Sequence, residues 1–168
     1  APLTFAGALC KDFLRKTQNI EIGSHIYRVG QVFDAPFDLT SVDRGILSQL
    51  QLNDMPVLKA ETAERIIDEI ANAKNDLDSI GGVIECAVVG AEPGIGSPMF
   101  NNVESRIASI LYSIPAVKGV EFGLGFDIAG MRGSEANDCY LLEDDEVKTK
   151  TNYNGGIVGG ITTGMPIV

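Results

Sequence analysis

The stretch from Thr151 to Ile167, read as TNYNGGIVGGITTGMPI, constrains this chain more than any other part of it. It holds five glycines, at 155, 156, 159, 160 and 164, among isoleucine, valine and threonine residues. Glycine weakens a strand and gives it no side chain to pack, so paired glycines between strand formers indicate close approach by another backbone or by a ligand. The alternative, which the spacing alone favours, is a twisted and bulged strand packed under a helix.

This glycine spacing does not fit the common phosphate-binding loops. The chain has no Gly-x-x-x-x-Gly-Lys-Ser/Thr sequence. The run from Gly155 to Gly160 is not the Gly-x-Gly-x-x-Gly pattern of dinucleotide-binding folds, and no evident helix follows it. Another explanation for the glycines is therefore needed.

Composition indicates a folded protein. The chain has 168 residues, of which 45% are hydrophobic, and we expect one domain over residues 1–168. The net charge of −10 argues against a dedicated nucleic-acid or anionic-membrane surface, since such surfaces need excess lysine and arginine. No apolar run is long enough to cross a membrane and no leader pattern is evident, so a cytoplasmic location is expected.

The residue types that carry chemistry are sparse. Cys10, Cys86 and Cys139 lack Cys-x-x-Cys spacing, and we expect each to be a small buried hydrophobe. His25 is the only histidine, and we expect a strand histidine bonded to a neighbour rather than a general base. The acidic run Glu143 to Glu146 predicts an exposed turn or disordered loop, with divalent-metal binding as the alternative.

Hydrophobic periodicity predicts a mixture of helices and strands. Phe5, Leu9, Phe13 and Leu14 predict the apolar face of a first helix, and Val103, Ile107, Ile110 and Leu111 the inward face of a later one. Helices are expected at residues 41–50, 56–77 and 101–113, with a short helical stretch near 127–131, and strands at 20–32, 82–90 and 117–122. Strand 82–90 reads as largely buried, so its Glu85 needs a partner or solvent.

Several motifs together resemble the chorismate synthase family. The stretch TNYNGGIVGGITTGMPI is similar to the family's Thr-Asn-x-x-Gly-Gly-Ile-x-Gly-Gly-Ile-x-x-Gly-Met-Pro-Ile segment. APLTFAGALCKDFL resembles its Thr-Ala-Pro helix, GAEPGIGSPMF its Gly-x-Pro-x-Gly-x-Gly-x-Pro-x-Phe loop, IPAVKGVEFGLGF a family hallmark, and GSEAND its Gly-Ser-Glu-x-Asn-Asp segment. These matches follow one another in order along almost the whole chain.

The resemblance implies an α+β fold, part of the family's layered β-α-β sandwich, and a homotetramer. It also implies a lyase activity: conversion of 5-enolpyruvylshikimate 3-phosphate to chorismate and phosphate, a 1,4-elimination of the shikimate pathway that requires reduced FMN. The family's histidines and arginine-rich segment would lie upstream, and its Lys-Pro-x-x-(Ser/Thr) and Arg-x-Asp segments downstream. We therefore expect a central fragment, without catalytic residues and without turnover by itself.

The resemblance assigns three residues of this chain to the FMN shell. Pro115 and Ala116 match the pair that precedes Val-Lys-Gly, although many members have Asn or Gln at the first position. Gly159 matches the glycine that contacts FMN in the Gly-Gly-Ile-x-Gly-Gly run. Four further residues in matching motifs are expected to make structural hydrogen bonds: Ser134, Asn137, Asp138 and Asn152. Two cations, Lys118 and Arg132, are expected to lie on solvated surface, with contact to a phosphate as the alternative.

Two rival functions belong to other classes. One is a catalytically inert structural core that serves assembly and binds neither flavin nor substrate. The other is a metal-binding module that uses Glu143 to Glu146. Retention of a divalent ion would distinguish the metal-binding module from the inert core. Saturable FMN binding would exclude the inert core.

Overall fold

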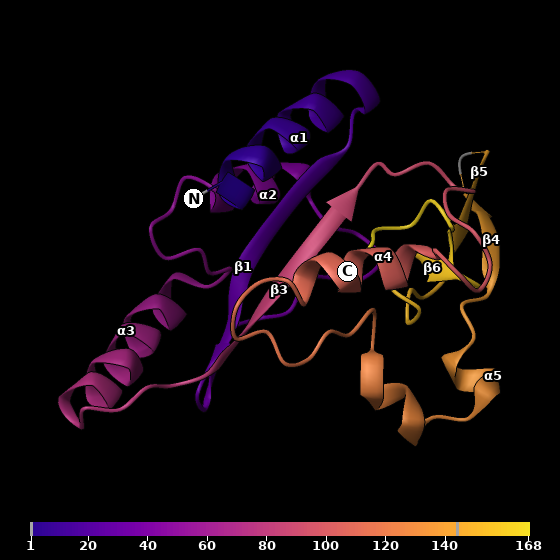
Figure 1. The fold of residues 1–168 in the computed structure, drawn as a ribbon. Coiled ribbons are helices and arrows are strands. Elements are labelled where there is room, and N and C mark those ends of the chain that lie inside the picture. Colours follow the sequence, from indigo (N-terminus) through magenta and orange to yellow (C-terminus); the bar gives the residue numbers. More distant parts are fainter. Residues whose placement is uncertain (1, 144) are drawn as a thin grey trace.

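The computed structural model describes residues 2–143 and 145–168. Helices and strands are mixed along the chain, as the sequence predicts, and Figure 1 shows their arrangement. In chain order the elements are α1 (Pro2–Gln18), β1 (Glu21–Val29), β2 (Val32–Phe33), α2 (Arg44–Leu50), α3 (Ala60–Asn75), β3 (Gly82–Val89), α4 (Val103–Leu111), the 3-10 helix η1 (Gly125–Gly130), α5 (Gly133–Ala136), β4 (Tyr140–Glu143), β5 (Glu146–Thr149), β6 (Ile157–Val158) and β7 (Ile161–Thr162).

The first half of the chain is built on a three-stranded antiparallel sheet in the order β2-β1-β3. The long pair β1 and β3 runs diagonally across Figure 1, and the second half of the chain lies beyond β3. The single strand expected at residues 20–32 is in fact a hairpin, because Gly30 takes a left-handed φ of 54° and turns the chain into β2.

One face of this sheet is buried although its sequence looks polar. On β1 the buried positions include Glu21, Gly23 and His25, whereas the isoleucines belong to the opposite face. Helix α2 packs at Gly23, where an added Cβ would lie 2.8 Å from atoms of the fully buried Leu47. The missing side chain of Gly23 therefore lets α2 approach β1 closely and bury that face.

The opposite face of the sheet is open, and this corrects the expectation of a buried strand at residues 82–90. Ile84 is 61% exposed and Ala87 is the only buried residue of β3. Helix α1 is also uncovered on its apolar side, because Phe5, Leu9 and Phe13 are each more than half exposed. Periodicity correctly predicted the apolar side of α1, but no described segment covers it. On β3, Ile84 is uncovered, whereas Val88 on the same face packs against Ala91, Ile157 and Ile167.

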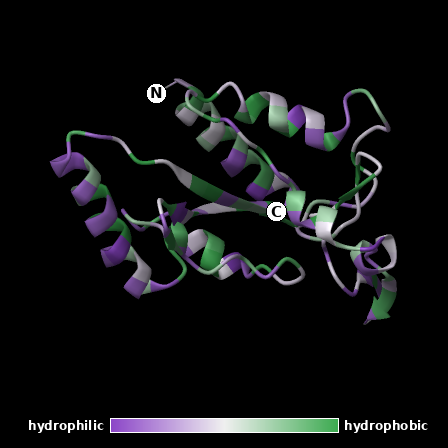
Figure 2. Cartoon of the chain, turned by 90° about the horizontal axis from the view of Figure 1, so that it is seen from below, coloured by the Kyte–Doolittle hydropathy of each residue, from purple (hydrophilic) through white to green (hydrophobic). Residues whose placement is uncertain are grey.

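Helix α3 begins at Ala60, four residues after Pro56, and ends just before Leu77, whose φ of 57° is incompatible with a helix. Figure 2 shows the mixture of hydrophilic and hydrophobic residues along it. Of the predicted stripe, Ile66 is fully buried, whereas Ile67 is half exposed. The helix thus packs along a narrow line against β1 and β2.

The second half of the chain contains short elements and long connections. Residues 117–122, predicted as a strand, form none, and among the predicted inward residues of α4, Ile110 is 68% exposed. A small core of Ala91, Ile157 and Ile167 holds this half against β3, where Val88 and Ile167 exchange backbone hydrogen bonds. The C-terminal strand-like segment therefore joins the two halves.

All three cysteines are free and exposed, which contradicts the expectation of buried thiols. Cys86 lies on the open face of β3 and Cys10 on the uncovered α1, so the missing cover explains both. Within the described residues, no helix combines the length and the hydropathy that a bilayer crossing requires.

Candidate functional site

The glycine-rich stretch is a tight hairpin with crowded turns, not a continuous bulged strand. Strands β6 and β7 pair in the register Ile157 with Thr162 and Val158 with Ile161. Gly159 and Gly160 form the two-residue loop, with φ of 61° and 86°. Positive φ at both loop positions is the type I′ geometry, whose twist matches that of a hairpin and which glycine adopts without strain.

Backbone crowding explains three of the five glycines. A Cβ on Gly155 would collide with the amide of Gly123, and one on Gly156 with the carbonyl of Pro166. A Cβ on Gly160 would lie 2.7 Å from the carbonyl oxygen of Ser97 and would also collide with the Asn102 side chain at the start of α4. Close backbone approach, one of the two explanations open from the sequence, is therefore confirmed at these positions.

Gly159 differs from these three. Its φ is also left-handed, but a Cβ placed on it meets no atom within 4 Å, and the residue is exposed. Its position in the hairpin loop accounts for the backbone conformation, while the fold leaves the space beside it empty. Of the three residues assigned to a flavin, this one offers bare backbone next to open space.

Pro115 and Ala116 form an exposed turn after α4. The Val117 amide donates to the carbonyl of Ile114, 3.3 Å away, and Ala116 has a φ of 71°. Proline at the second position and positive φ at the third are features of a type II turn, where glycine is the usual third residue. Alanine at this position is strained, and backbone strain of this kind occurs often at ligand-binding sites.

The turn and the hairpin loop lie at opposite ends of α4. The Val103 amide at the start of the helix donates to the carbonyl of Gly160, and Pro115 follows the other end. The nine residues of α4 span about 13 Å at the helical rise. A single ligand in contact with both Gly159 and Ala116 would have to extend along the helix, as an elongated molecule such as FMN does.

A second glycine-containing loop lies against the hairpin, a juxtaposition that sequence reasoning missed. The hydroxyl of Thr162 donates to the carbonyl of Glu92 at 2.6 Å and accepts from the amide of Ile95 at 2.9 Å. The amide of Gly94 donates to the carbonyl of Thr162 at 2.9 Å. Residues 92–95 and strand β7 thus form one unit. No local sequence pattern predicts this contact, because it joins segments about seventy residues apart.

Two polar side chains hold the hairpin in place, as expected for structural hydrogen bonds. The Asp138 carboxylate accepts from the Thr151 hydroxyl, from the Tyr153 amide and from both nitrogens of Asn154, at 2.8–2.9 Å. Burial alone would raise the pKa of Asp138, but these hydrogen bonds outweigh it and the pKa is lowered.

Asn152 connects segments that are far apart in sequence. Its side-chain amide donates to the carbonyls of Leu39 and Pro166, and its oxygen accepts from the amide of Gly156. The side chain is buried, so no ligand reaches it. The other expected structural residues are exposed: Asn137 donates to the sulfur of Cys139, 3.4 Å away, and Ser134 lies on the surface of α5.

The remaining polar candidates lie away from the hairpin loop. His25 is bonded to Asp34 and Glu85, which confirms a strand histidine paired with its neighbours and gives Glu85 the partner it needed. Lys118 and Arg132 are both exposed, as expected of solvated cations.

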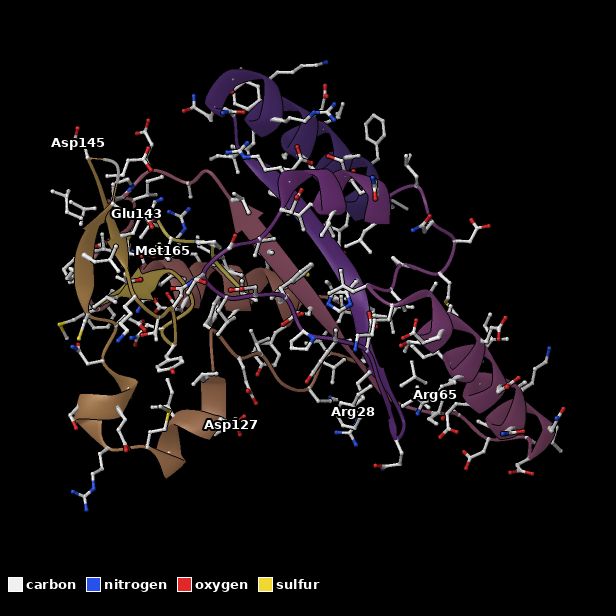
Figure 3. The ribbon with its side chains drawn as sticks, turned by 180° about the vertical axis from the view of Figure 1, so that it is seen from behind. Arg28, Arg65, Asp127, Glu143, Asp145 and Met165 are labelled. Atoms are coloured by element: carbon white, nitrogen blue, oxygen red, sulfur yellow. The ribbon has the colours of Figure 1, made fainter. Side chains whose placement is uncertain are left out.

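Asp144 lies outside the described residues, and the described acids of the run lie at the end of the β4–β5 hairpin, where Glu143 pairs with Glu146. Figure 3 shows Glu143 and Asp145 at its tip. Lys148 forms ion pairs with Glu143 at 3.0 Å and Glu146 at 3.8 Å. Over residues 2–143 and 145–168, no three His, Cys, Asp or Glu side chains gather as a metal site would require.

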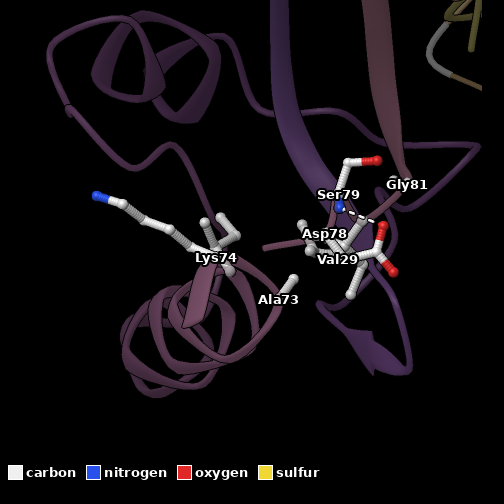
Figure 4. A pocket seen from close by; sticks show the side chains of 9 residues that line it. Val29, Ala73, Lys74, Asp78, Ser79 and Gly81 are labelled. Atoms are coloured by element: carbon white, nitrogen blue, oxygen red, sulfur yellow. Dashed lines mark hydrogen bonds between the residues drawn. The ribbon is translucent and has the colours of Figure 1, made fainter. Parts of the chain in front are cut away.

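Two hollows lie in the first half of the chain. One, shown in Figure 4, is at the C-terminal end of α3, between Lys74 and the loop in which the Ser79 amide donates to Asp78. The other is a cleft between α2 and the start of α3, lined by residues that include Phe37, Leu58 and Lys59. Neither contains a residue assigned to FMN, and neither gathers a set of free polar groups suited to catalysis.

Comparison with known proteins agrees with the resemblance seen in the sequence. The family described as chorismate synthase matches residues 1–168. The chain is 43% identical to a chorismate synthase of Pyrococcus abyssi, over 97% of this chain and 44% of the relative. It is 38% identical to one of Lancefieldella parvula, over 99% of this chain and 46% of the relative. The chain therefore spans less than half the length of these curated relatives.

A solved structure supports the same assignment. The crystal structure of a chorismate synthase superposes with a TM-score of 0.86 at 32% sequence identity, over 96% of this chain and 50% of that chain. The α+β fold implied by the resemblance is confirmed by this match. With the family pattern matched from residue 1 to residue 168 and the fold shared, the chain belongs to the chorismate synthase family.

Proposed function

We propose that this chain forms the folding core and part of the flavin shell of a chorismate synthase, a lyase that converts 5-enolpyruvylshikimate 3-phosphate to chorismate and phosphate in the cytoplasm. Family membership along the whole chain supports the proposal. The observation that carries it is Gly159, an exposed left-handed glycine beside open space in a run where three other glycines are closed in by neighbouring atoms.

The chain's own contribution is to bind and orient. Gly159 leaves room for a cofactor, and the exposed turn at Pro115 and Ala116 offers a second contact beyond the far end of α4. Reduced FMN, when bound, supplies electron density that favours departure of the phosphate. Lys118 and Arg132, the two cations to which a phosphate contact is open, are exposed, and we propose that most cations for the anionic substrate come from outside this chain.

The chain by itself is expected to have no turnover. Its one histidine is 1% exposed and both ring nitrogens are bonded to carboxylates, so it cannot reach a substrate. A general acid or base must lie within hydrogen-bond reach of the proton it transfers. Chorismate formation by the purified chain with substrate and reduced FMN would contradict this expectation.

Assembly with further polypeptide, as in a homotetramer, is part of the proposal. The accessible surface is 11255 Å², against about 8,000 Å² for a compact monomer of this mass. The excess of roughly 3,000 Å² on this one chain is larger than the ~1,000–2,500 Å² that each partner contributes to a typical obligate interface. It includes the open face of β3 and the apolar side of α1.

An FMN titration followed by flavin fluorescence tests the cofactor assignment. It is run with oxidised and anaerobically reduced flavin, with and without 5-enolpyruvylshikimate 3-phosphate. Asparagine tolerates left-handed backbone, so Gly159→Asn places a side chain in the open space at small cost to the fold. Gly94→Asn is the matched control, since Gly94 also has positive φ and an unobstructed Cβ.

Saturable binding that Gly159→Asn weakens and Gly94→Asn leaves unchanged would support the assignment. Equal effects of the two variants would contradict the role of Gly159. No binding up to millimolar FMN would favour the second candidate, an inert assembly core. The separation of Gly159 and Ala116 along α4 is the observation in favour of that second candidate, because neither contact alone encloses a ligand.

A further inference from the structure

A buried carboxylate–histidine–carboxylate cluster lies in the sheet, apart from the residues assigned to FMN. His25 on β1 is 1% exposed, and Asp34, just after β2, is 5% exposed. Nδ1 of His25 lies 3.1 Å from Oδ2 of Asp34, and Nε2 lies 2.7 Å from Oε2 of Glu85 on β3. One imidazole ring therefore bridges two acidic side chains that come from different segments.

Both carboxylates also accept hydrogen bonds from the backbone. Asp34 accepts from the amides of Leu58 and Lys59, and Glu85 accepts from the amide of Phe37 at 2.8 Å. These three amides, hereafter the latch amides, belong to segments 34–37 and 58–59. Both segments line the cleft between α2 and the start of α3. The cluster thus fastens one wall of the cleft to the sheet.

The hydrogen-bond partners restrict which protonation states of the ring satisfy every contact. An ionised carboxylate can only accept hydrogen bonds, and each ring nitrogen of His25 faces a carboxylate oxygen. A neutral imidazole has one N–H donor and one bare nitrogen, so it would place an acceptor against an acceptor. With both carboxyl groups ionised, an imidazolium, with two N–H donors, satisfies Asp34 and Glu85 together.

The surroundings of the ring are compatible with a charged form. Tyr27 on the same strand and Phe37 present their rings edge-on, with centroids 6.3 and 4.6 Å away. From the other packed segments, the charged groups bonded to the ring are the carboxylates of Asp34 and Glu85. The Glu85 side chain is 16% exposed, so water reaches the net negative charge of the cluster.

We propose that Asp34, His25 and Glu85 form a proton-dependent latch that closes one wall of the cleft. With both ring protons present, segments 34–37 and 58–59 are tied to the sheet through the latch amides. When the ring loses one proton, one nitrogen–carboxylate contact becomes repulsive, and the segment bonded to that carboxylate loosens. The cleft wall then opens locally while the rest of the fold stays in place.

The protonation state is tested by ¹⁵N NMR of the ring. The chain has one histidine, so the ring signals need no assignment. At pH 7 we expect two nitrogens with the shift of protonated imidazolium. A nitrogen with the pyridine-type shift of neutral imidazole at that pH would overturn the proposal.

The latch itself is tested by amide hydrogen exchange over rising pH. The amides of Val88 and Ile167 serve as internal controls, because they bond between backbones away from the cluster. As the ring deprotonates, the latch amides should exchange faster than the controls by about tenfold to a hundredfold, the range for hydrogen bonds to charged groups. Latch amides that follow the controls, or a ring that keeps both protons until global unfolding, would overturn the proposal.

A conservative variant distinguishes the latch from a general destabilisation of the fold at high pH. In Glu85→Gln the new amide pairs with either form of the ring, since it offers both an acceptor oxygen and a donor nitrogen. The extra exchange at the latch amides should therefore disappear, whereas Glu64→Gln, at an exposed position on α3, should keep it. Extra exchange that persists unchanged in Glu85→Gln would refute the mechanism. If this variant does not fold, the exchange measured on the unmodified chain decides.

Discussion

Replacement of Asp138 by alanine removes the group that organises the glycine-rich hairpin. The carboxylate is 8% exposed and accepts four hydrogen bonds, from the Thr151 hydroxyl, the Tyr153 amide and two nitrogens of Asn154. Each bond to a charged acceptor contributes about 1.5–3 kcal/mol, and partly exposed donors recover some of that from water. We therefore expect the free energy of unfolding to fall by about 3–5 kcal/mol.

The assay is urea denaturation followed by circular dichroism. Asp127→Ala is the control, because Asp127 is an exposed acid on η1 and its loss should change the free energy of unfolding by less than about 0.5 kcal/mol. An Asp138→Ala variant within about 1 kcal/mol of the unmodified chain would refute the reasoning, since the hydrogen bonds together would then contribute less than one bond to a charged group is worth.

Acid should reproduce part of this effect. Because the pKa of Asp138 is lowered from its ordinary value of 3.8, the folded chain binds this proton less readily than the unfolded chain. The stabilisation is therefore present above that ordinary value and is lost as the pH falls through the folded pKa. Between pH 5 and roughly pH 2, Asp138→Asn should lose less stability than the unmodified chain. Parallel losses in urea unfolding would contradict the assignment.

Further predictions concern packing and backbone conformation. Leu47 is fully buried against Gly23, so Leu47→Ala should lower the free energy of unfolding by about 2–5 kcal/mol in urea denaturation. Leu52→Ala, at a side chain that is 85% exposed, should change it by less than about 0.5 kcal/mol. Gly156→Ala should prevent the native hairpin, seen as loss of dispersed amide NMR signals, because its Cβ collides with the carbonyl of Pro166. Gly130→Ala has open space and should keep the native spectrum; equal spectra for both glycine variants would contradict the crowding.

Helices and strands were predicted well wherever hydrophobic periodicity was strong. The sequence did not predict which of their apolar faces are covered by other segments. Helix α1 has the expected apolar face, yet Phe5 and Phe13 are exposed, because a repeat of 3.6 residues reports which side is apolar and not whether anything packs there. The same limit applies to Ile84 on β3. The buried face of β1 was unpredictable from hydropathy, since Gly23 and His25 are buried by α2 and by the carboxylate cluster.

The candidate site shows the same division. The glycine run indicated close backbone approach, and the structure shows this at Gly155, Gly156 and Gly160. No local signal separated Gly159 from them, because the difference is the empty space around one loop position. The contact between residues 92–95 and Thr162 spans about seventy residues of sequence and depends on tertiary folding alone.

The buried side chain of Asn152 has a consequence for the order of folding. Its donors reach the carbonyl of Leu39, 113 residues away in sequence, and that of Pro166, 14 residues ahead. Contacts of such separation form slowly, because a long loop must close before they contribute stability. During synthesis the Asn152 side chain can therefore donate to the carbonyl of Pro166 only after that residue has left the ribosome, so this link between the segments is among the last to form.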